Sequence, residues 1–201
     1  MSNLIPLLQD IHACRLCAAY LPFAPKAILQ AGKQARILII GQAPGIKAHN
    51  SGIPWSDASG ERLRAWLGVT ATQFYDPNLF AIMPMGFCYP GRGKSGDLPP
   101  RPECAPHWHA KLLEQMPDIT LTLLIGQYAQ NYYLQDNFKT LTERVEHWHD
   151  YLPKNIFVLP HPSPRNQIWL KKNPWFEQKA VPELQRRVRQ ITNGHATDAV
   201  L

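Results

Sequence analysis

The sequence predicts an α/β fold, namely a three-layer α/β/α sandwich around a mostly parallel, four-stranded central sheet. Four short apolar runs, rich in branched and aromatic residues, recur along the chain, which is typical of strands that are buried on both faces. Segments with helical periodicity lie between these runs. Strands that alternate with helices indicate a parallel sheet that helices cover on both sides.

The four apolar runs are expected to form the strands of the sheet. They span residues 35–40, 79–83, 119–125 and 155–159. Loops at the carboxyl ends of such strands usually hold the ligand. Two loops that combine rigid turns with polar side chains follow strands here, at residues 41–45 and 160–163. We therefore expect a site at this edge of the sheet.

Four further stretches are expected to be helical. They span residues 60–67, 103–116, 127–134 and 174–191, the last interrupted or restarted at Pro182. In the first stretch, Leu63, Trp66 and Leu67 share one face, which is the pattern of a helix that packs on a core.

Length and composition limit the class of protein. A chain of 201 residues with 45% hydrophobic residues suits a single domain, residues 1–201, of which the tail 193–201 is expected to fray. No run approaches the roughly 18 apolar residues that span a bilayer. Residues 1–10 lack the pattern of a signal peptide, so we expect a cytoplasmic protein without membrane contact, and a monomer.

The chain is basic, with a formal net charge of +6 and an isoelectric point of about 9.2. Between residues 161 and 193, seven basic residues stand against two acidic ones, so most of the excess lies in one segment. Clustered positive charge favours a nucleic-acid backbone as partner over a merely solubilising surface. The basic residues are Arg165, Lys171, Lys172, Lys179, Arg186, Arg187 and Arg189.

The first loop reads Gly-Gln-Ala-Pro-Gly, residues 41–45. Gly41 and Gly45 allow a tight turn and Pro44 stiffens it, so that the neutral amide of Gln42 is held at the sheet edge. An ordinary strand-to-loop turn explains the stretch equally well. The glycine spacing excludes the common phosphate-binding loops.

The second loop reads His-Pro-Ser-Pro-Arg-Asn, residues 161–166. Prolines flank both His161 and Ser163, so the loop is expected to be rigid. A histidine held in this way is well placed to donate a hydrogen bond to a developing anion, and the alternative is a histidine that only satisfies loop carbonyls.

The four cysteines are Cys14, Cys17, Cys88 and Cys104, and the first two form a C-x2-C pair. Disulfides are rare in cytosolic proteins, so this set indicates metal binding or redox chemistry. The C-x2-C pair follows a helical stretch rather than a strand, which speaks against thioredoxin-like chemistry. A [4Fe–4S] cluster, a zinc ion and plain buried thiols remain open.

Three other polar stretches receive an ordinary structural interpretation. In the two His-Trp-His segments, 107–109 and 147–149, the two rings would point to different faces of a helix, so we expect surface histidines around a packing tryptophan. Residues 91–97 mimic a phosphate loop but open no helix. Arg92 and Lys94 can still contact a DNA phosphate.

The two loops resemble the signature motifs of the uracil-DNA glycosylase superfamily, and the resemblance extends from Cys14 to about Trp175. The 41–45 turn, followed by Ser-Gly-Ile-Pro-Trp at 51–55, resembles the thermostable iron–sulfur members, of family four and five type. The 161–166 loop is closer to the single-strand-selective monofunctional type.

The resemblance implies a DNA repair enzyme that flips a base out of the helix and hydrolyses its N-glycosidic bond. It implies that His161 stabilises the leaving base, that Gln42 positions water and that Trp55 stacks on the flipped base. It further assigns substrate contacts to Gly41, Ala43, Pro44, Gly45, Met85 and Ser163, DNA contacts to Arg165, Asn166, Lys171 and Lys172, and [4Fe–4S] ligation to the four cysteines.

Two positions depart from the pattern of the family. The iron–sulfur members have a carboxylate where this chain has Gln42, and the family usually reads uracil with an asparagine where this chain has Pro84. We therefore expect backbone groups of residues 85–88 to read the base. We expect excision of uracil or a related deaminated base. The alternatives are a non-catalytic binder of DNA or damaged bases and an unrelated small-molecule hydrolase on the same fold.

Overall fold

The computed structural model describes residues 3–198 and confirms the predicted α/β class. Four parallel strands form the central sheet, in the order β2-β1-β5-β6. In the register, Ile37 lies opposite Phe80 on one side and opposite Leu121 on the other. The strands are β1 (Ile37–Ile40), β2 (Phe80–Ile82), β5 (Leu121–Ile125) and β6 (Ile156–Leu159), each within one of the predicted runs.

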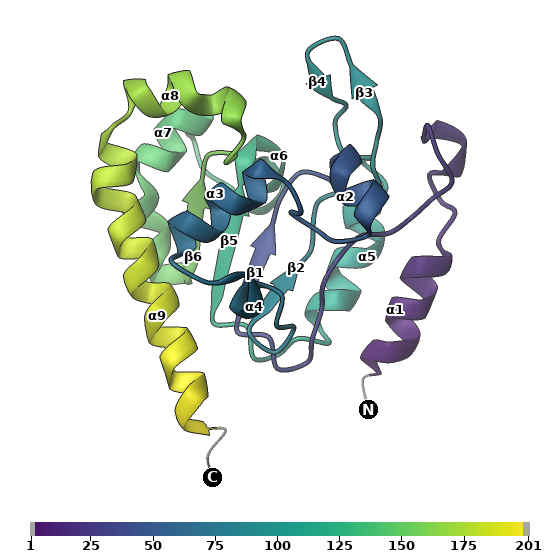
Figure 1. Cartoon of the computed structure of the whole chain (residues 1–201), viewed down its shortest axis with the longest axis horizontal. Helices are drawn as coiled ribbons and strands as arrows, with labels where there is room; N and C mark the ends of the chain where they lie inside the picture. Colours follow the sequence, from purple (N-terminus) through teal and green to yellow (C-terminus); the bar gives the residue numbers. More distant parts are fainter. Residues whose placement is uncertain (1–2, 199–201) are drawn as a thin grey trace.

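Alternate residues of each strand face opposite layers of helices, which produces the sandwich (Figure 1). Ile37 and Ile39 pack with α3 (Ala58–Leu67) and α9 (Val181–Asp198), whereas Leu38 and Ile40 pack with α1 (Leu4–Ala13) and α5 (Cys104–Leu113). The remaining helices are α2 (Ile46–Ser51), α4 (Ala71–Phe74), α6 (Gly126–Tyr133), α7 (Leu141–Glu146) and α8 (Gln167–Lys172).

Short helical turns complete the layers, and one of them precedes α9. A π-helical turn, Phe176–Ala180, runs directly into α9, so the predicted interruption falls one residue before Pro182. Pro182 has no N–H to donate, so it makes no helical hydrogen bond to the preceding turn. The helix α9 continues to Asp198, beyond the start of the expected frayed tail, and residues 199–201 lie outside the described residues. The 3-10 turns are Ala18–Tyr20, Trp148–Lys154 and Pro164–Asn166.

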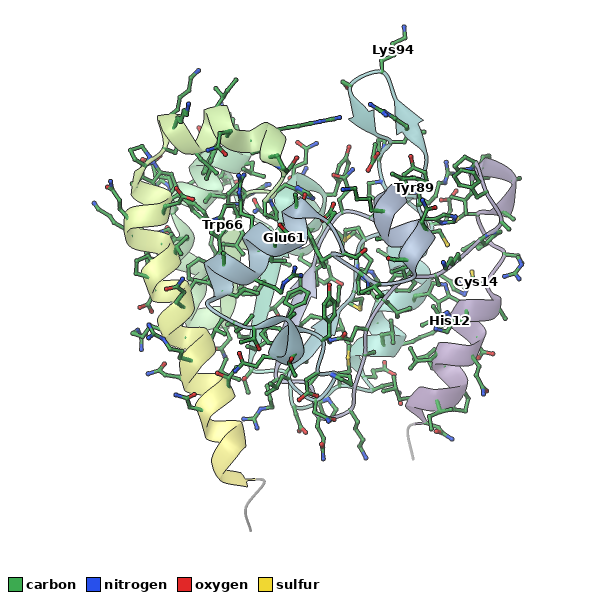
Figure 2. All side chains as sticks on the ribbon, in the orientation of Figure 1. His12, Cys14, Glu61, Trp66, Tyr89 and Lys94 are labelled. Carbon is green, nitrogen blue, oxygen red and sulfur yellow. The ribbon has the colours of Figure 1, made fainter. Side chains whose placement is uncertain are left out.

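A small antiparallel hairpin of β3 (Arg92–Gly93) and β4 (Gly96–Asp97), which was not among the predicted elements, projects from the body. Figure 1 shows it standing beyond the carboxyl ends of the sheet strands, and Figure 2 shows Lys94 at its tip, pointing away from the body. Within residues 3–198, no helix is both long and apolar enough to cross a membrane.

The expectation of surface histidines is wrong for His109. Its side chain is only 2% exposed, and its Nε2 donates to the carbonyl oxygen of Pro84 at 3.1 Å. Its Nδ1 accepts a hydrogen bond from the hydroxyl of Tyr133 at 2.6 Å. Burial lowers the pKa of His109 to about 4, so the ring is neutral at pH 7.

Candidate active site

A cavity of about 600 Å³ opens at the carboxyl ends of the sheet strands, where the two loops were expected to meet. The 41–45 turn and helix α2 form one wall, residues 54–59 another, and the 161–166 loop with the hairpin residues 95–97 a third. Ile28, Ile82 and Pro84 complete the lining. A cavity of this size accommodates a nucleobase with part of its sugar.

The 41–45 turn is held by strand-like hydrogen bonds to the chain that follows β2. The N–H of Met85 donates to the carbonyl oxygen of Gly41 at 2.9 Å, and the N–H of Gly86 donates to that of Gln42 at 3.1 Å. The side-chain amide of Gln42 donates through Nε2 to the carbonyl oxygen of Leu98 at 3.3 Å. Gln42 is thus oriented by both its backbone and its side chain.

Trp55 adopts a strained backbone conformation, with φ of 56° in the left-handed region that favours glycine. Its carbonyl oxygen accepts from Arg64 Nη1 and from the Tyr75 hydroxyl, each at 3.3 Å. Its indole lies on Gly41, where a Cβ would come within 2.9 Å of Trp55 Cζ2. Only glycine at position 41 leaves room for this ring in the cavity wall.

His161 lies beside Trp55 in the cavity lining, with 5.5 Å between the ring centroids. Its Nδ1 accepts a hydrogen bond from the N–H of Ser163 at 3.2 Å. Burial lowers the pKa of His161, against the opposing charge of Asp57. The ring is therefore neutral at pH 7 and carries its proton on Nε2, which makes Nε2 a hydrogen-bond donor.

Hydrogen bonds also hold the rest of the 161–166 loop against neighbouring segments. Asn166 Nδ2 donates to the carbonyl oxygen of His161 at 2.7 Å, and Arg62 Nη1 donates to that of Ser163 at 3.2 Å. Arg165 Nη1 donates to the carbonyl oxygen of Ser95 at 2.9 Å and so ties this loop to the hairpin.

The structure brings most of the predicted site residues into one cavity. Its lining includes Gly41, Gln42, Ala43, Pro44, Gly45, Trp55, His161, Ser163, Arg165 and Asn166. It does not bring Met85 there, because this side chain is buried in the core below the cavity. Lys171 and Lys172 are exposed at the end of α8, outside the cavity lining.

Of the backbone groups of residues 85–88 that were expected to read the base, three N–H groups are already engaged within the protein. The N–H groups of Met85 and Gly86 donate to the 41–45 turn, and that of Phe87 donates to Cys104 Sγ at 3.4 Å. The carbonyl oxygen of Pro84 already accepts from His109. These groups hold the cavity floor together.

Two lining residues, Asp57 and Asp97, were missed by the sequence analysis. Asp57 caps α3, with Oδ1 accepting from the N–H of Gly60 at 3.0 Å, and the Ser-Asp-Ala-Ser pattern at 56–59 is a recognisable helix start. Asp97 comes from the unpredicted hairpin, and no local sequence signal indicates that it reaches this cavity.

The four cysteines line a second, much smaller cavity of about 30 Å³. Cys14 ends α1, Cys104 begins α5, and burial raises the pKa of the Cys104 thiol to about 12. Backbone N–H groups are directed at sulfur here, since Phe87 donates to Cys104 and Lys26 donates to Cys88. Within residues 3–198, no three His, Cys, Asp or Glu side chains converge closely enough to hold a metal ion. The donors nevertheless fit a thiophilic metal group, because four sulfurs share one cavity.

Comparison with known proteins agrees with this arrangement of loops and strands. The profile of the Uracil DNA glycosylase superfamily matches residues 29–185, which include the sheet and both cavity loops. The chain belongs to this superfamily. It is also 25% identical over 202 residues to a type-4 uracil-DNA glycosylase from Sulfurisphaera tokodaii, a match that covers 95% of this chain and 86% of that protein.

Proposed function

We propose that the protein hydrolyses the N-glycosidic bond of uracil or a related deaminated base in DNA. The observation that carries the proposal is His161, a neutral ring that lines the cavity beside Trp55 and whose Nδ1 is occupied by the N–H of Ser163, which leaves its proton on Nε2. A fixed, uncharged donor stabilises a base that leaves as an anion and needs no reorganisation during the reaction.

The reaction begins with a base that has left the stack, because the bond to be cut is inaccessible inside a duplex. Trp55 stacks on the flipped base, a contact worth roughly 1–3 kcal/mol. As the bond between the base and C1′ breaks, its electron pair stays on the base, and His161 donates a hydrogen bond to the base oxygen. Gln42 positions the water through its amide, which the Leu98 carbonyl orients.

The DNA backbone is expected to cross the side of the molecule from which the hairpin projects. Arg165 lines the cavity and is tied to the hairpin, which contains Arg92 in β3. Figure 2 shows Lys94 at the tip of the same hairpin. Lys171 and Lys172 at the end of α8 extend the basic surface. Phosphate contacts of this kind position the nucleic acid without reading its sequence.

We infer a [4Fe–4S] cluster held by Cys14, Cys17, Cys88 and Cys104, the thiols that share the smaller cavity. Such a cluster would supply a rigid link between α1 and the 88–104 loop rather than chemistry at the glycosidic bond. The N–H groups that already point at sulfur would stabilise the bound thiolates.

The cluster has a direct chemical test. Protein purified without oxygen should be brown and contain about four iron and four sulfide ions per chain. The Cys104→Ser variant should lose most of both. Colourless protein without iron, or with zinc in its place, would contradict the assignment.

The glycosylase function is tested with oligonucleotides that carry one uracil, hypoxanthine or xanthine, in single and double strands. After incubation with the protein, alkali cleaves the strand wherever a base has been removed. Cleavage at the modified position by the natural chain, and not by His161→Ala, is the expected result.

A non-catalytic binder on the same fold is the second candidate, and the neutral Gln42 in place of a carboxylate favours it. In that case both the natural chain and His161→Ala would leave every oligonucleotide intact, while the natural chain would still bind the uracil-containing strand more tightly than the variant.

A further inference from the structure

The active-site cavity contains a carboxylate that the mechanism above does not use. Asp97 lies at the base of the hairpin and faces the 41–45 turn, since a Cβ placed on Gly45 would lie 3.4 Å from Asp97 Oδ2. The next residue, Leu98, accepts the hydrogen bond from Gln42. The hairpin therefore brings a carboxylate to the turn in which a carboxylate is missing.

The oxygens of Asp97 are available to a ligand. Within residues 3–198, no hydrogen bond or ion pair to this side chain is found, and Arg92 and Arg165 act on it only at longer range. Burial raises the pKa of Asp97 more than these two arginines lower it, and Asp57 raises it further. Asp97 is exposed on the hairpin, and the raised pKa makes its carboxylate a better proton acceptor.

The other cavity carboxylate has a structural duty. Asp57 Oδ1 accepts the N–H of Gly60 and so caps α3, whereas Asp97 caps no helix. Hydrolysis at C1′ needs a group that takes a proton from water, and amides such as Gln42 cannot do this. Within the described residues, Asp97 is the lining carboxylate with neither oxygen in a hydrogen bond, whereas Asp57 uses Oδ1 for its cap and keeps Oδ2 unpaired.

We propose that Asp97 is a catalytic residue that activates the attacking water, so that the hairpin supplies the carboxylate that the 41–45 turn lacks. The inference rests on the proposed glycosylase function. The water oxygen bonds to C1′ as the bond from C1′ to the base nitrogen breaks, and the electron pair of that bond leaves with the base. Asp97 accepts the proton of the water, and His161 holds the base anion until it is protonated.

The test compares single-turnover excision and DNA affinity in the same variants. Asp97→Asn should lower the excision rate on the order of a hundredfold or more. Its affinity for uracil-containing DNA should stay equal or rise, because a negative charge beside the cations Arg92 and Arg165 is removed. A purely structural role for Asp97 would instead weaken binding and excision together, which would overturn the proposal.

Rescue gives the sharper evidence. Adding Gln42→Glu to Asp97→Asn returns a carboxylate to the turn and should restore at least part of the lost rate. Asp57→Asn, which keeps an oxygen to cap α3, should lose less activity than Asp97→Asn. Asp118→Asn, outside the cavity, serves as the matched control and should match the natural chain.

Three further results would overturn the proposal. Asp97→Asn could excise at the natural rate, or Asp57→Asn could abolish excision while Asp97→Asn retains it, and either result leaves the glycosylase function standing. No excision by the natural chain on any substrate would overturn that function as well, so the two failures are distinguishable.

Discussion

The active-site cavity and the cysteine cavity differ in how far the protein arranges their polar groups without a ligand. In the active-site cavity, Gln42, His161 and Asn166 are each held by hydrogen bonds to the backbone. In the cysteine cavity, four thiols share a space, yet they do not converge as metal ligands. The first site is preorganised, whereas in our proposal a bound metal group would order the second.

The preorganisation of the first cavity is consistent with its task. Donors that are fixed before the substrate arrives stabilise charge in the transition state without reorganisation. A structural metal group, in contrast, contributes its binding energy directly to folding. The two cavities should therefore respond differently to substitution, one mainly in activity and the other mainly in stability.

The largest expected effect is on stability at the cysteine cavity. In iron-loaded protein, Cys104→Ser should lower the free energy of unfolding by more than about 3 kcal/mol, because binding energy of the metal group is lost. In protein prepared without iron, the same change should have a much smaller effect. Chemical denaturation of both preparations measures the difference, and an equal loss in the two would show that packing alone makes Cys104 important.

A second stability effect concerns the floor of the active-site cavity. His109 has a folded-state pKa of about 4, so between pH 6.5 and 4 the unfolded chain binds a proton that the folded chain does not. Stability from this group is complete above pH 6.5 and falls as the pH drops, by about 3 kcal/mol at pH 4. Glutamine does not titrate, so between pH 7 and 4 the His109→Gln variant should lose about 3 kcal/mol less free energy of unfolding than the natural chain. Urea titrations at both pH values measure the two losses. Parallel curves for the two proteins would contradict the burial of a neutral ring.

Trp55 tests the active-site cavity alone. Trp55→Gly removes the stacking surface and should weaken binding of uracil-containing DNA by roughly 5- to 150-fold. The same change also relieves backbone strain, because glycine adopts the φ of 56° at this position without cost. This gain offsets part of the packing lost with the indole ring, so the melting temperature should change little. Fluorescence anisotropy and thermal melting check the two parts, and unchanged affinity would remove Trp55 from the site.

The smallest effect is expected at the tip of the hairpin. Lys94→Ala should weaken DNA binding only slightly, and equally for strands with and without uracil, because a phosphate contact carries no base information. In a plot of log affinity against log salt concentration, the magnitude of the slope should decrease by about one. Asp118→Lys, remote from the cavity, is a suitable charge control, and an unchanged slope in Lys94→Ala would place the DNA elsewhere.

The sheet and the two cavity loops could be predicted because their signals are local. Branched apolar runs predict buried strands, and the glycines and prolines of 41–45 and 161–166 predict the turns that follow two of them. The hairpin could not be predicted in this way, because its strands are only two residues long. The placement of Asp97 depends on how the hairpin docks against Gly45, which is a tertiary contact.

His109 illustrates a second limit of local reasoning. Considering helix faces alone, we placed it at the surface, yet Tyr133 and Pro84, both distant in sequence, supply the partners that allow its ring to be buried. The same holds for the backbone of residues 85–87, whose N–H groups are already bonded to the 41–45 turn and to Cys104.

The ionisation and tautomer of His161 test the central claim most directly. Nitrogen-15 NMR of the histidine rings, with His161→Gln to assign the signal, reports the protonation of each nitrogen at pH 7. A neutral ring with its proton on Nε2, whose Nε2 signal shifts when free uracil and abasic DNA are added, is the predicted result. A charged ring, or a proton on Nδ1, would contradict the preorganised donor on which the proposed reaction depends.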